Sequence, residues 1–253
     1  RVMLRNRRIG CSVSGVAQFI TNRGIDELRT WLEEGYDTIQ EWDKEYSDWF
    51  AIPKSIKTTS VKPSGTVSLL AGATPGLHYP ESRFYTRRIR LSINSELVEP
   101  LKKAGYKIEP AYGSEDSTLV VEIPVDVGEG IRTASELTIW EQFSIAAFLQ
   151  RHWADNQVSC TVTFDPEKEG EQIPHVLNYY QYHLKGISLL PRHDYGAYKQ
   201  MPYEAIEEKE YNKQVKKLGK LSFGVIKNEE AEVDKFCNNE SCEIPGLNVE
   251  ENS

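Results

Sequence analysis

The chain has 253 residues, a formal net charge of −8 at pH 7 and only four cysteines. It has no apolar run long enough to span a bilayer and no N-terminal signal peptide, so we expect a cytoplasmic protein without a membrane partner. The acidic balance argues against a protein that coats nucleic acid, and four cysteines do not form a disulfide scaffold. The chain begins at Arg1, as expected of a processed product or of part of a longer polypeptide.

Strands and helices alternate along the first half of the chain. Apolar residues recur at helical spacing between 25 and 50, and Pro53 separates this helix from the next strand. A helix at 95–105 ends at Gly105, a plausible C-terminal glycine. The other elements expected here are strands at 9–13, 55–61, 87–93 and 119–123.

The second half continues the alternation. Thr133 and Glu136 have the spacing of a capping box before an apolar helix at 137–153, which we expect to be buried. Alternating residues predict a strand at 158–164, followed by a helix at 173–186 and a strand at 187–190. Repeated strand–helix–strand units predict an α/β protein with parallel pairing.

The last residues differ from the rest. After about residue 227 the sequence becomes acidic and loses its periodicity, which is typical of a flexible tail. We therefore expect a folded region at 1–226 and a tail at 227–253. The tail contains Cys237 and Cys242, four residues apart, in the stretch FCNNESC.

The stretch TTSVKPSGTVSLLAG predicts a strand, a turn at Pro63, Ser64, Gly65 and Thr66, and a short helix. Such a turn exposes backbone N–H groups and hydroxyls at a helix N-terminus, which suits a phosphate group. It is not a Walker A loop, because no Gly-Lys-Ser/Thr follows at the required spacing. From these residues alone, an ordinary helix cap is the favoured explanation.

The order of several motifs is more specific than any one of them. RNRRIGCSVSG, KPSGTVSLLAGATPGLHYP, KGISLLPRHDYGAYKQMPYEAI and the terminal pair of cysteines follow one another in this chain. Together they resemble the C-terminal part of the adenosylcobalamin-dependent ribonucleoside-triphosphate reductases. The resemblance implies an α/β fold, namely the C-terminal portion of a ten-stranded α/β barrel, with adenosylcobalamin as cofactor.

The resemblance also implies roles for particular residues. Pro63, Ser64, Gly65 and Thr66 match the loop that binds the phosphates of the ribonucleoside triphosphate. Cys237 and Cys242 match a redox shuttle pair, which reduces the active-site disulfide and passes it to thioredoxin or a similar reductant. A mobile tether and a nearby second thiol suit such exchange. A zinc site would require further ligands near the tail, and unpaired cysteines without a role are the other alternative.

The family's radical-bearing cysteine motif is absent from this chain, and so is the active-site thiol pair. We therefore expect the chain to be catalytically incomplete without an upstream part of the same enzyme. The alternative function is a non-catalytic α/β nucleotide-binding module with a thiol-binding or metal-binding tail. No metal site is predicted, because the five histidines form no pair at helical ligand spacing.

Other residues receive structural interpretations. Cys11 and Cys160 lie in predicted strands and are expected to be small core residues. An arginine cluster follows the phosphate loop and is a candidate for contact with substrate phosphates, but we favour a solvated or salt-bridged strand for nearly all of it. Tyr179 and Tyr180 raise the alternative of an iron-dependent reductase with a radical relay, but their helical pattern favours packing. The arginines of the cluster are Arg83, Arg87, Arg88 and Arg90.

Overall fold

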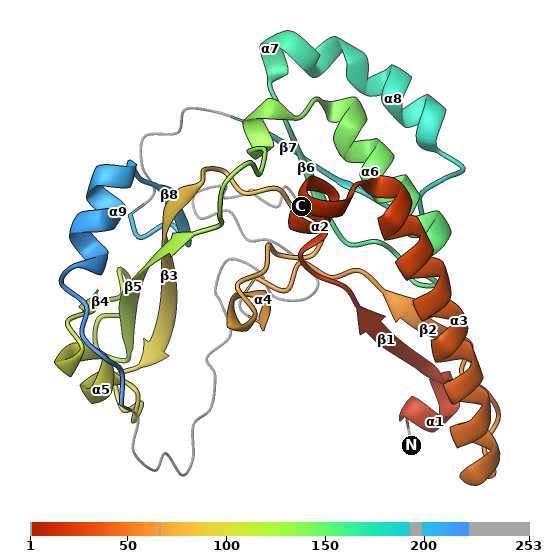
Figure 1. The fold of residues 1–253 in the computed structure, drawn as a ribbon, viewed down its shortest axis with the longest axis horizontal. Helices are drawn as coiled ribbons and strands as arrows, with labels where there is room; N and C mark the ends of the chain where they lie inside the picture. Colours follow the sequence, from red (N-terminus) through yellow and green to blue (C-terminus); the bar gives the residue numbers. More distant parts are fainter. Residues whose placement is uncertain (1, 66, 193–198, 223–253) are drawn as a thin grey trace, which may run out of the picture. The chain divides into compact units, whose positions relative to one another are not determined.

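The computed structural model describes residues 2–65, 67–192 and 199–222 (Figure 1). They divide into two compact units, which are described separately. Unit 1 contains the described residues of 1–83 and 127–194, and unit 2 contains those of 84–126 and 195–253. The predicted tail at 227–253 lies outside the described residues, so the boundary near residue 227 stays a prediction.

Parallel strands form the framework of unit 1. β1 (Arg8–Ser12) pairs with β2 (Lys57–Ser60), and β6 (Thr161–Phe164) pairs with β7 (Ser188–Pro191). A parallel bridge between Val61 and Val158 joins the two pairs. The bridge places the residue after β2 beside the segment before β6, and the parallel pairing predicted from the sequence is confirmed within each pair.

Helix α6 (Ile139–His152) is the centre of the core of unit 1. Ile139, Phe143 and Leu149 are fully buried, as the all-round apolar sequence predicts. They belong to a cluster that includes residues of α3 (Ile25–Trp49) and β6. The remaining helices of this unit are α1 (Val2–Asn6), α2 (Val16–Arg23), α4 (Val67–Leu70), α7 (Pro166–Glu169) and α8 (Ile173–Tyr180).

Two successive capping boxes precede this core helix. The predicted box of Thr133 and Glu136 is present, but it begins a separate 3-10 helix at Ala134–Glu136. α6 itself begins after a second box, in which the Thr138 side chain accepts from the Glu141 N–H and the Glu141 carboxylate accepts from the Thr138 N–H. The capping box predicted for the long apolar helix therefore caps the 3-10 helix instead. The sequence pattern cannot separate the two boxes, because both pairs are three residues apart.

Unit 2 contains a four-stranded antiparallel sheet in the order β4, β5, β3, β8. Its strands are β3 (Phe84–Ser92), β4 (Lys107–Pro110), β5 (Thr118–Asp126) and β8 (Tyr203–Ala205), accompanied by α5 (Val98–Lys103) and α9 (Glu208–Val215). The prediction of parallel pairing is wrong for these neighbours. β3 and β4 do run in the same direction through α5, but β5 lies between them and pairs antiparallel with both.

One helix is shorter than predicted, and the ten-stranded barrel stays a prediction. The helix predicted at 173–186 ends at Tyr180. The described strands form two parallel pairs and one open antiparallel sheet, and no closed barrel is present among them. Within the described part of the chain, no helix is both long and apolar enough to cross a membrane.

Candidate functional site

The carboxyl ends of the parallel strands in unit 1 lie at one edge, where ligands bind in open α/β sheets. β1 ends at Ser12 and residues 13–15 follow it at this edge, and residues 62–65 follow β2. Two of the motifs quoted above, RNRRIGCSVSG and KPSGT, are therefore brought to neighbouring positions by strand pairing. Arg192 follows β7 at the same edge.

Hydrogen bonds join the two loops directly. The hydroxyl oxygens of Ser14 and Ser64 are 2.6 Å apart. The Lys62 N–H donates to Ser12 Oγ at 3.0 Å, and the Gly76 N–H donates to Ser64 Oγ at 3.1 Å. The predicted phosphate-loop serine is thus a junction of three segments, and its hydroxyl is already engaged within the protein.

Ser64 also bonds to the short helix α4, which begins at Val67. Its carbonyl oxygen accepts from the Ser68 N–H at 3.0 Å and from the Ser68 hydroxyl at 2.6 Å. Its φ of 50° is in the left-handed region, which is uncommon for a residue other than glycine. Because α4 is a single turn of four residues, its dipole is small, and an anion at this turn would depend on local N–H groups and hydroxyls.

A third segment, residues 72–76, closes against this turn. The Gly76 carbonyl accepts from the Val16 N–H at 3.3 Å, and the Thr74 carbonyl accepts from the Gly15 N–H at 2.8 Å. Gln18 bridges the same segment, because its amide accepts from the Thr74 N–H and donates to the Gly72 carbonyl. The segment at 72–76 is therefore held by backbone and Gln18 side-chain bonds to the start of α2.

The structure describes three of the four predicted phosphate-binding residues. Pro63 is exposed, and Ser64 and Gly65 are half-buried. Thr66 lies outside the described residues. Sequence reasoning missed Ser12 and Ser14, although both lie in a motif that had been singled out. The signal available for them was a pair of hydroxyls at the end of a predicted strand, with Ser12 near its end and Ser14 immediately after it.

The predicted tail cysteines, Cys237 and Cys242, lie outside the described residues, so their pairing stays a prediction. Of the other two, Cys160 is buried as expected, and burial raises the pKa of its thiol to about 12. The expectation for Cys11 is wrong, because this residue is exposed. All five residues of β1 are exposed, so this strand contributes no core positions in the described structure.

His78 is fixed behind the loops by two hydrogen bonds. Its Nε2 accepts from the Thr161 N–H at 3.2 Å, and its Nδ1 lies 3.2 Å from the Pro75 carbonyl. This arrangement selects the neutral tautomer with the proton on Nδ1, which donates to Pro75. Burial lowers the pKa of the imidazole. His78 therefore acts as a neutral connector between the loop and β6.

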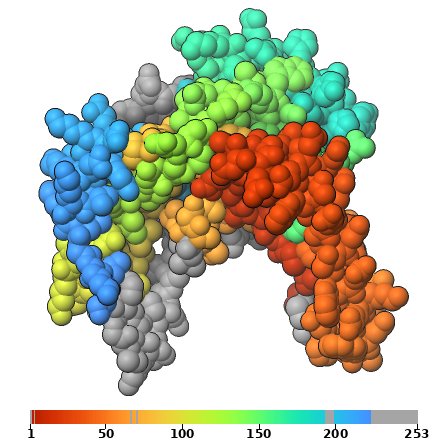
Figure 2. Space-filling model, in the orientation of Figure 1, coloured from red at the N-terminus to blue at the C-terminus, as the bar shows by residue number. Residues whose placement is uncertain are grey.

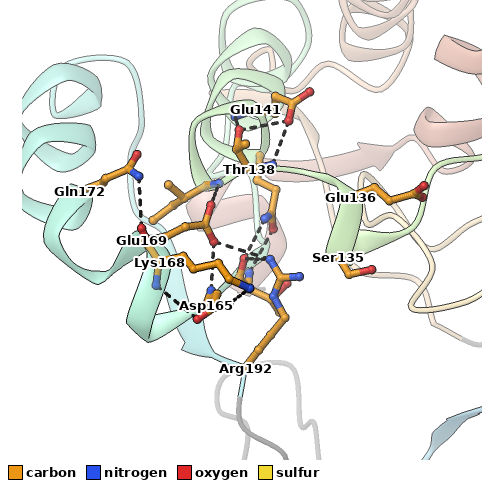
Figure 3. Close-up of polar contacts among 12 residues, drawn as sticks. Ser135, Glu136, Thr138, Glu141, Asp165, Lys168, Glu169, Gln172 and Arg192 are labelled. Carbon is orange, nitrogen blue, oxygen red and sulfur yellow. Dashed lines mark hydrogen bonds and ion pairs between the residues drawn. The ribbon is translucent and has the colours of Figure 1, made fainter.

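Arg192 is anchored at the end of β7 (Figure 3). Its Nη2 lies 3.7 Å from a carboxylate oxygen of Glu169. Glu169 accepts from the N–H of Ile139 at 2.8 Å and from the N–H of Asp165 at 3.0 Å. The carboxylate thus links the first turn of α6, the start of α7 and the arginine.

A small cavity of about 50 Å³ lies beside β6. Its lining includes Glu81, Gln142 and Thr163, and burial raises the pKa of the Glu81 carboxyl while Arg192 opposes that change. Among the described residues, Thr163 Oγ1 is buried without a hydrogen-bond partner. The cavity has room for a few water molecules and is too small for a nucleoside.

The arginine cluster lies mainly on β3 of unit 2. Arg88 forms ion pairs with Glu122 at 2.9 Å and with Glu204. Arg87 is almost fully buried and lies over the ring of Tyr203, 4.4 Å from its centroid. These contacts support the salt-bridged interpretation. The described residues contain no group of three or more His, Cys, Asp or Glu side chains able to hold a metal ion.

Comparison with known proteins shows close relatives over nearly the whole chain. The "Adenosylcobalamin-dependent ribonucleoside-triphosphate reductase" of Euglena gracilis is 56% identical over 246 residues, covering 95% of this chain and 34% of that protein. The "Probable adenosylcobalamin-dependent ribonucleoside-triphosphate reductase" of Dictyostelium discoideum is also 56% identical, covering 99% of this chain and 33% of its own length. No model of a protein family matches the chain.

A solved structure is similar to this chain in both sequence and fold. A crystal structure of a B-12 dependent (class II) ribonucleotide reductase is 33% identical, with a TM-score of 0.73 over 86% of this chain and 34% of that chain. The fold is thus a mixed α/β fold of the class II reductase type. By sequence the chain belongs to the adenosylcobalamin-dependent ribonucleoside-triphosphate reductases, and it spans about a third of the length of the relatives it matches.

Proposed function

We propose that this chain works as the C-terminal third of an enzyme that reduces ribonucleoside triphosphates to 2′-deoxyribonucleoside triphosphates. The observation that carries the proposal is 56% identity over 95% of the chain to a protein named for this activity. The contact between the two motif loops supports it, because both motifs meet at the carboxyl edge of the strands. The remaining two thirds of the enzyme would come from a segment that this chain does not contain.

The turn at 62–65, with Thr66, supplies the substrate phosphate site in this proposal. Its N–H groups and the neighbouring serines form a polar edge, and exposed Lys62 adds a positive charge beside it. Because Ser64 Oγ already bonds to Ser14 and Gly76, we assign that hydroxyl to shaping the turn. Gly65 lets the triphosphate approach the backbone.

The tail supplies electrons. Reduction of the ribose 2′-carbon releases its hydroxyl as water and oxidises two thiols of the complete enzyme to a disulfide. A thiolate of the Cys237 and Cys242 pair attacks that disulfide, and the second thiol resolves the mixed disulfide. The tail leaves as a disulfide and is reduced in turn by thioredoxin or a similar dithiol protein.

The cofactor in this proposal is adenosylcobalamin, which supplies the initiating radical when it is bound. Its cobalt is carried in its own macrocycle, so the lack of a metal-ligand cluster among the described residues does not conflict with it. We assign no described residue to the cobalamin. We also propose that β1, β2, β6 and β7 are strands of a ten-stranded barrel that the rest of the enzyme completes.

The proposal is tested by combining the chain with the part of the Euglena gracilis reductase that lies outside the matched third. We expect deoxynucleotide formation with adenosylcobalamin, a ribonucleoside triphosphate and thioredoxin, and none from the chain alone. Gly65→Val should raise KM for the triphosphate, because the backbone could no longer close on it. Cys237→Ser or Cys242→Ser should abolish turnover with thioredoxin and largely spare turnover with a small diffusible dithiol.

The outcomes separate the alternatives. Activity that is lost equally with both reductants would remove the shuttle role from the tail cysteines. An unchanged KM in Gly65→Val would remove the phosphate role from the turn. Nucleotide binding without any reduction in the combined enzyme would favour the non-catalytic nucleotide-binding module.

A further inference from the structure

Helix α3 carries an apolar seam that is longer than the core it packs against. Seven positions of this 25-residue helix are separated by alternating intervals of four and three residues, the spacing of a helix seam that meets a partner. In chain order these positions are Leu28, Leu32, Gly35, Ile39, Trp42, Tyr46 and Trp49.

The first half of the seam is buried. Leu28 and Leu32 are 5% and 3% exposed. A Cβ at Gly35 would lie 3.3 Å from the ring of Trp153, and Ile39 packs against the core of unit 1. These four positions explain why the helix is held along its N-terminal half.

The second half of the seam is exposed, although its three side chains are large and aromatic. Trp42 and Tyr46 are each 46% exposed, and Trp49 is 66% exposed. We call these three residues the aromatic seam; they belong to the orange surface of α3 in Figure 2. Their rings contact one another, with centroids 5.3 Å apart in both successive pairs. Ordered exposed aromatics of this kind are typical of a contact surface.

The apolar surface continues past the end of the helix. Phe50 is 70% exposed, and Ile52 and Ile56 are 39% and 49% exposed. The Ile56 N–H donates to the Arg7 carbonyl at 2.7 Å, which ties this stretch to the residue before β1. β1 is exposed along its whole length, whereas parallel strands are normally covered on both faces. Two adjacent features of unit 1 are thus left without a cover in the described structure.

We propose that the aromatic seam docks the remaining part of the reductase polypeptide, through an apolar segment with basic flanks. This inference rests on the proposed function in that the chain is taken as one third of a larger enzyme. The relatives have about twice as much further sequence as this chain matches, which is ample to cover the seam. Between 41 and 50 the acidic residues are Glu41, Asp43, Glu45 and Asp48, and Lys44 is the one basic residue. Basic flanks on the partner segment would complement this charge.

The experiment measures association between the 253-residue chain and the part of the Euglena gracilis reductase outside the matched third. The two are co-expressed, and the dissociation constant is measured by biolayer interferometry without nucleotide or cobalamin. The Trp42→Ala/Tyr46→Ala/Trp49→Ala variant should bind at least about tenfold more weakly, because central aromatics dominate such contacts. Trp31→Ala is the matched control, since Trp31 lies on the same helix and is 63% exposed. It should change the dissociation constant less than about twofold.

Oxidative footprinting gives a second readout that needs no substitution. Trp42 and Trp49 should be protected from oxidation in the complex, and Trp31 should be oxidised at its free rate. An unchanged dissociation constant in the triple variant, unchanged oxidation of Trp42 and Trp49, or no association of the wild-type chain would overturn the proposal. Self-association of the chain that the triple variant abolishes would assign the seam to a second copy and would also overturn it.

This design separates the inference from the proposed function. A complex that forms through the aromatic seam but makes no deoxynucleotide would refute the proposed activity and leave the docking surface intact. An active complex whose affinity is unchanged by the triple substitution would refute the docking surface alone.

Discussion

Ser14 and Ser64 are fifty residues apart in sequence, and their hydroxyl oxygens are 2.6 Å apart. Ser64 Oγ also accepts from the Gly76 N–H, so three segments of the chain meet at one hydroxyl. A hydroxyl can donate once and accept twice, so both bonds can form together. The turn that follows β2 is thus shaped by residues from before and after it, and the short helix α4 is not its main support.

Ser64→Ala should destabilise the protein more than Ser14→Ala. The first substitution removes the partner of both the Gly76 N–H and the Ser14 hydroxyl, and a polar group left unsatisfied costs about 1–3 kcal/mol. The second removes one partly exposed bond, worth about 0.5–1.5 kcal/mol. Urea unfolding of the two variants measures the difference. A smaller loss in Ser64→Ala than in Ser14→Ala would contradict the junction described here.

Gly76→Ala should disturb the turn, whereas Gly72→Ala should not. Both glycines have positive φ, 53° and 61°, so both substitutions carry the backbone strain of a left-handed alanine. A Cβ at Gly76 would lie 2.4 Å from the Lys62 carbonyl oxygen, and a Cβ at Gly72 would meet nothing within 4 Å. Backbone strain should lower the free energy of unfolding by about 1–2 kcal/mol in each variant. The clash with the Lys62 carbonyl should lower it further in Gly76→Ala only. Equal losses in the two variants would show that the contact with Lys62 relaxes without cost.

The spacing of apolar residues predicts a helix or strand correctly where one face of that element is buried. α6 and the first half of α3 pack as predicted, because Phe143, Leu149 and Leu28 follow the helical period into one core. Strand β6 follows the same rule, since Val162 and Phe164 are buried and alternate with more exposed neighbours. Apolar residues that recur every second residue, or at helical spacing, mark the buried face of a strand or a helix.

Periodicity could not report which strand neighbours which. β3, β4 and β5 look like any three strands in sequence, and only tertiary pairing inserts β5 between the other two. Burial of Cys11 was wrongly expected because an apolar strand indicates a covered position, yet β1 is exposed in the described structure. The contact of Ser14 with Ser64 likewise depends on strand pairing across fifty residues, and no local pattern encodes it.

Cys11 and Cys160 should differ in reactivity toward iodoacetamide. Cys11 is exposed, whereas Cys160 is buried and burial raises the pKa of its thiol to about 12. The thiolate is the reacting form, so at about pH 8 Cys160 should remain almost unmodified until the protein is unfolded. Mass spectrometry of the Cys237→Ser/Cys242→Ser variant resolves the two sites. Comparable modification of both cysteines under native conditions would contradict the burial of Cys160.

The last prediction concerns the response of stability to acid through His78. Burial lowers the pKa of this imidazole in the folded state below its usual value of 6.5. Below about pH 6.5 the unfolded chain therefore binds more protons at this residue than the folded chain does. The free energy of unfolding then rises with pH, so the contribution of neutral His78 is complete above its unfolded pKa and is lost as pH falls toward the folded pKa.

The structure gives the physical reason for this sign. Nε2 accepts a hydrogen bond from the Thr161 N–H. Protonation of Nε2 would break that bond, because the Nε2–H and the Thr161 N–H would then be two donors facing each other. His78→Gln removes the titration, so the loss of stability between about pH 7.5 and about pH 5.5 should be smaller in this variant than in the wild type. The raised pKa of Glu81 acts in the opposite direction in both proteins and cancels in the difference between them. Urea midpoints at the two pH values measure the effect, and parallel losses in both proteins would show that His78 does not stay neutral.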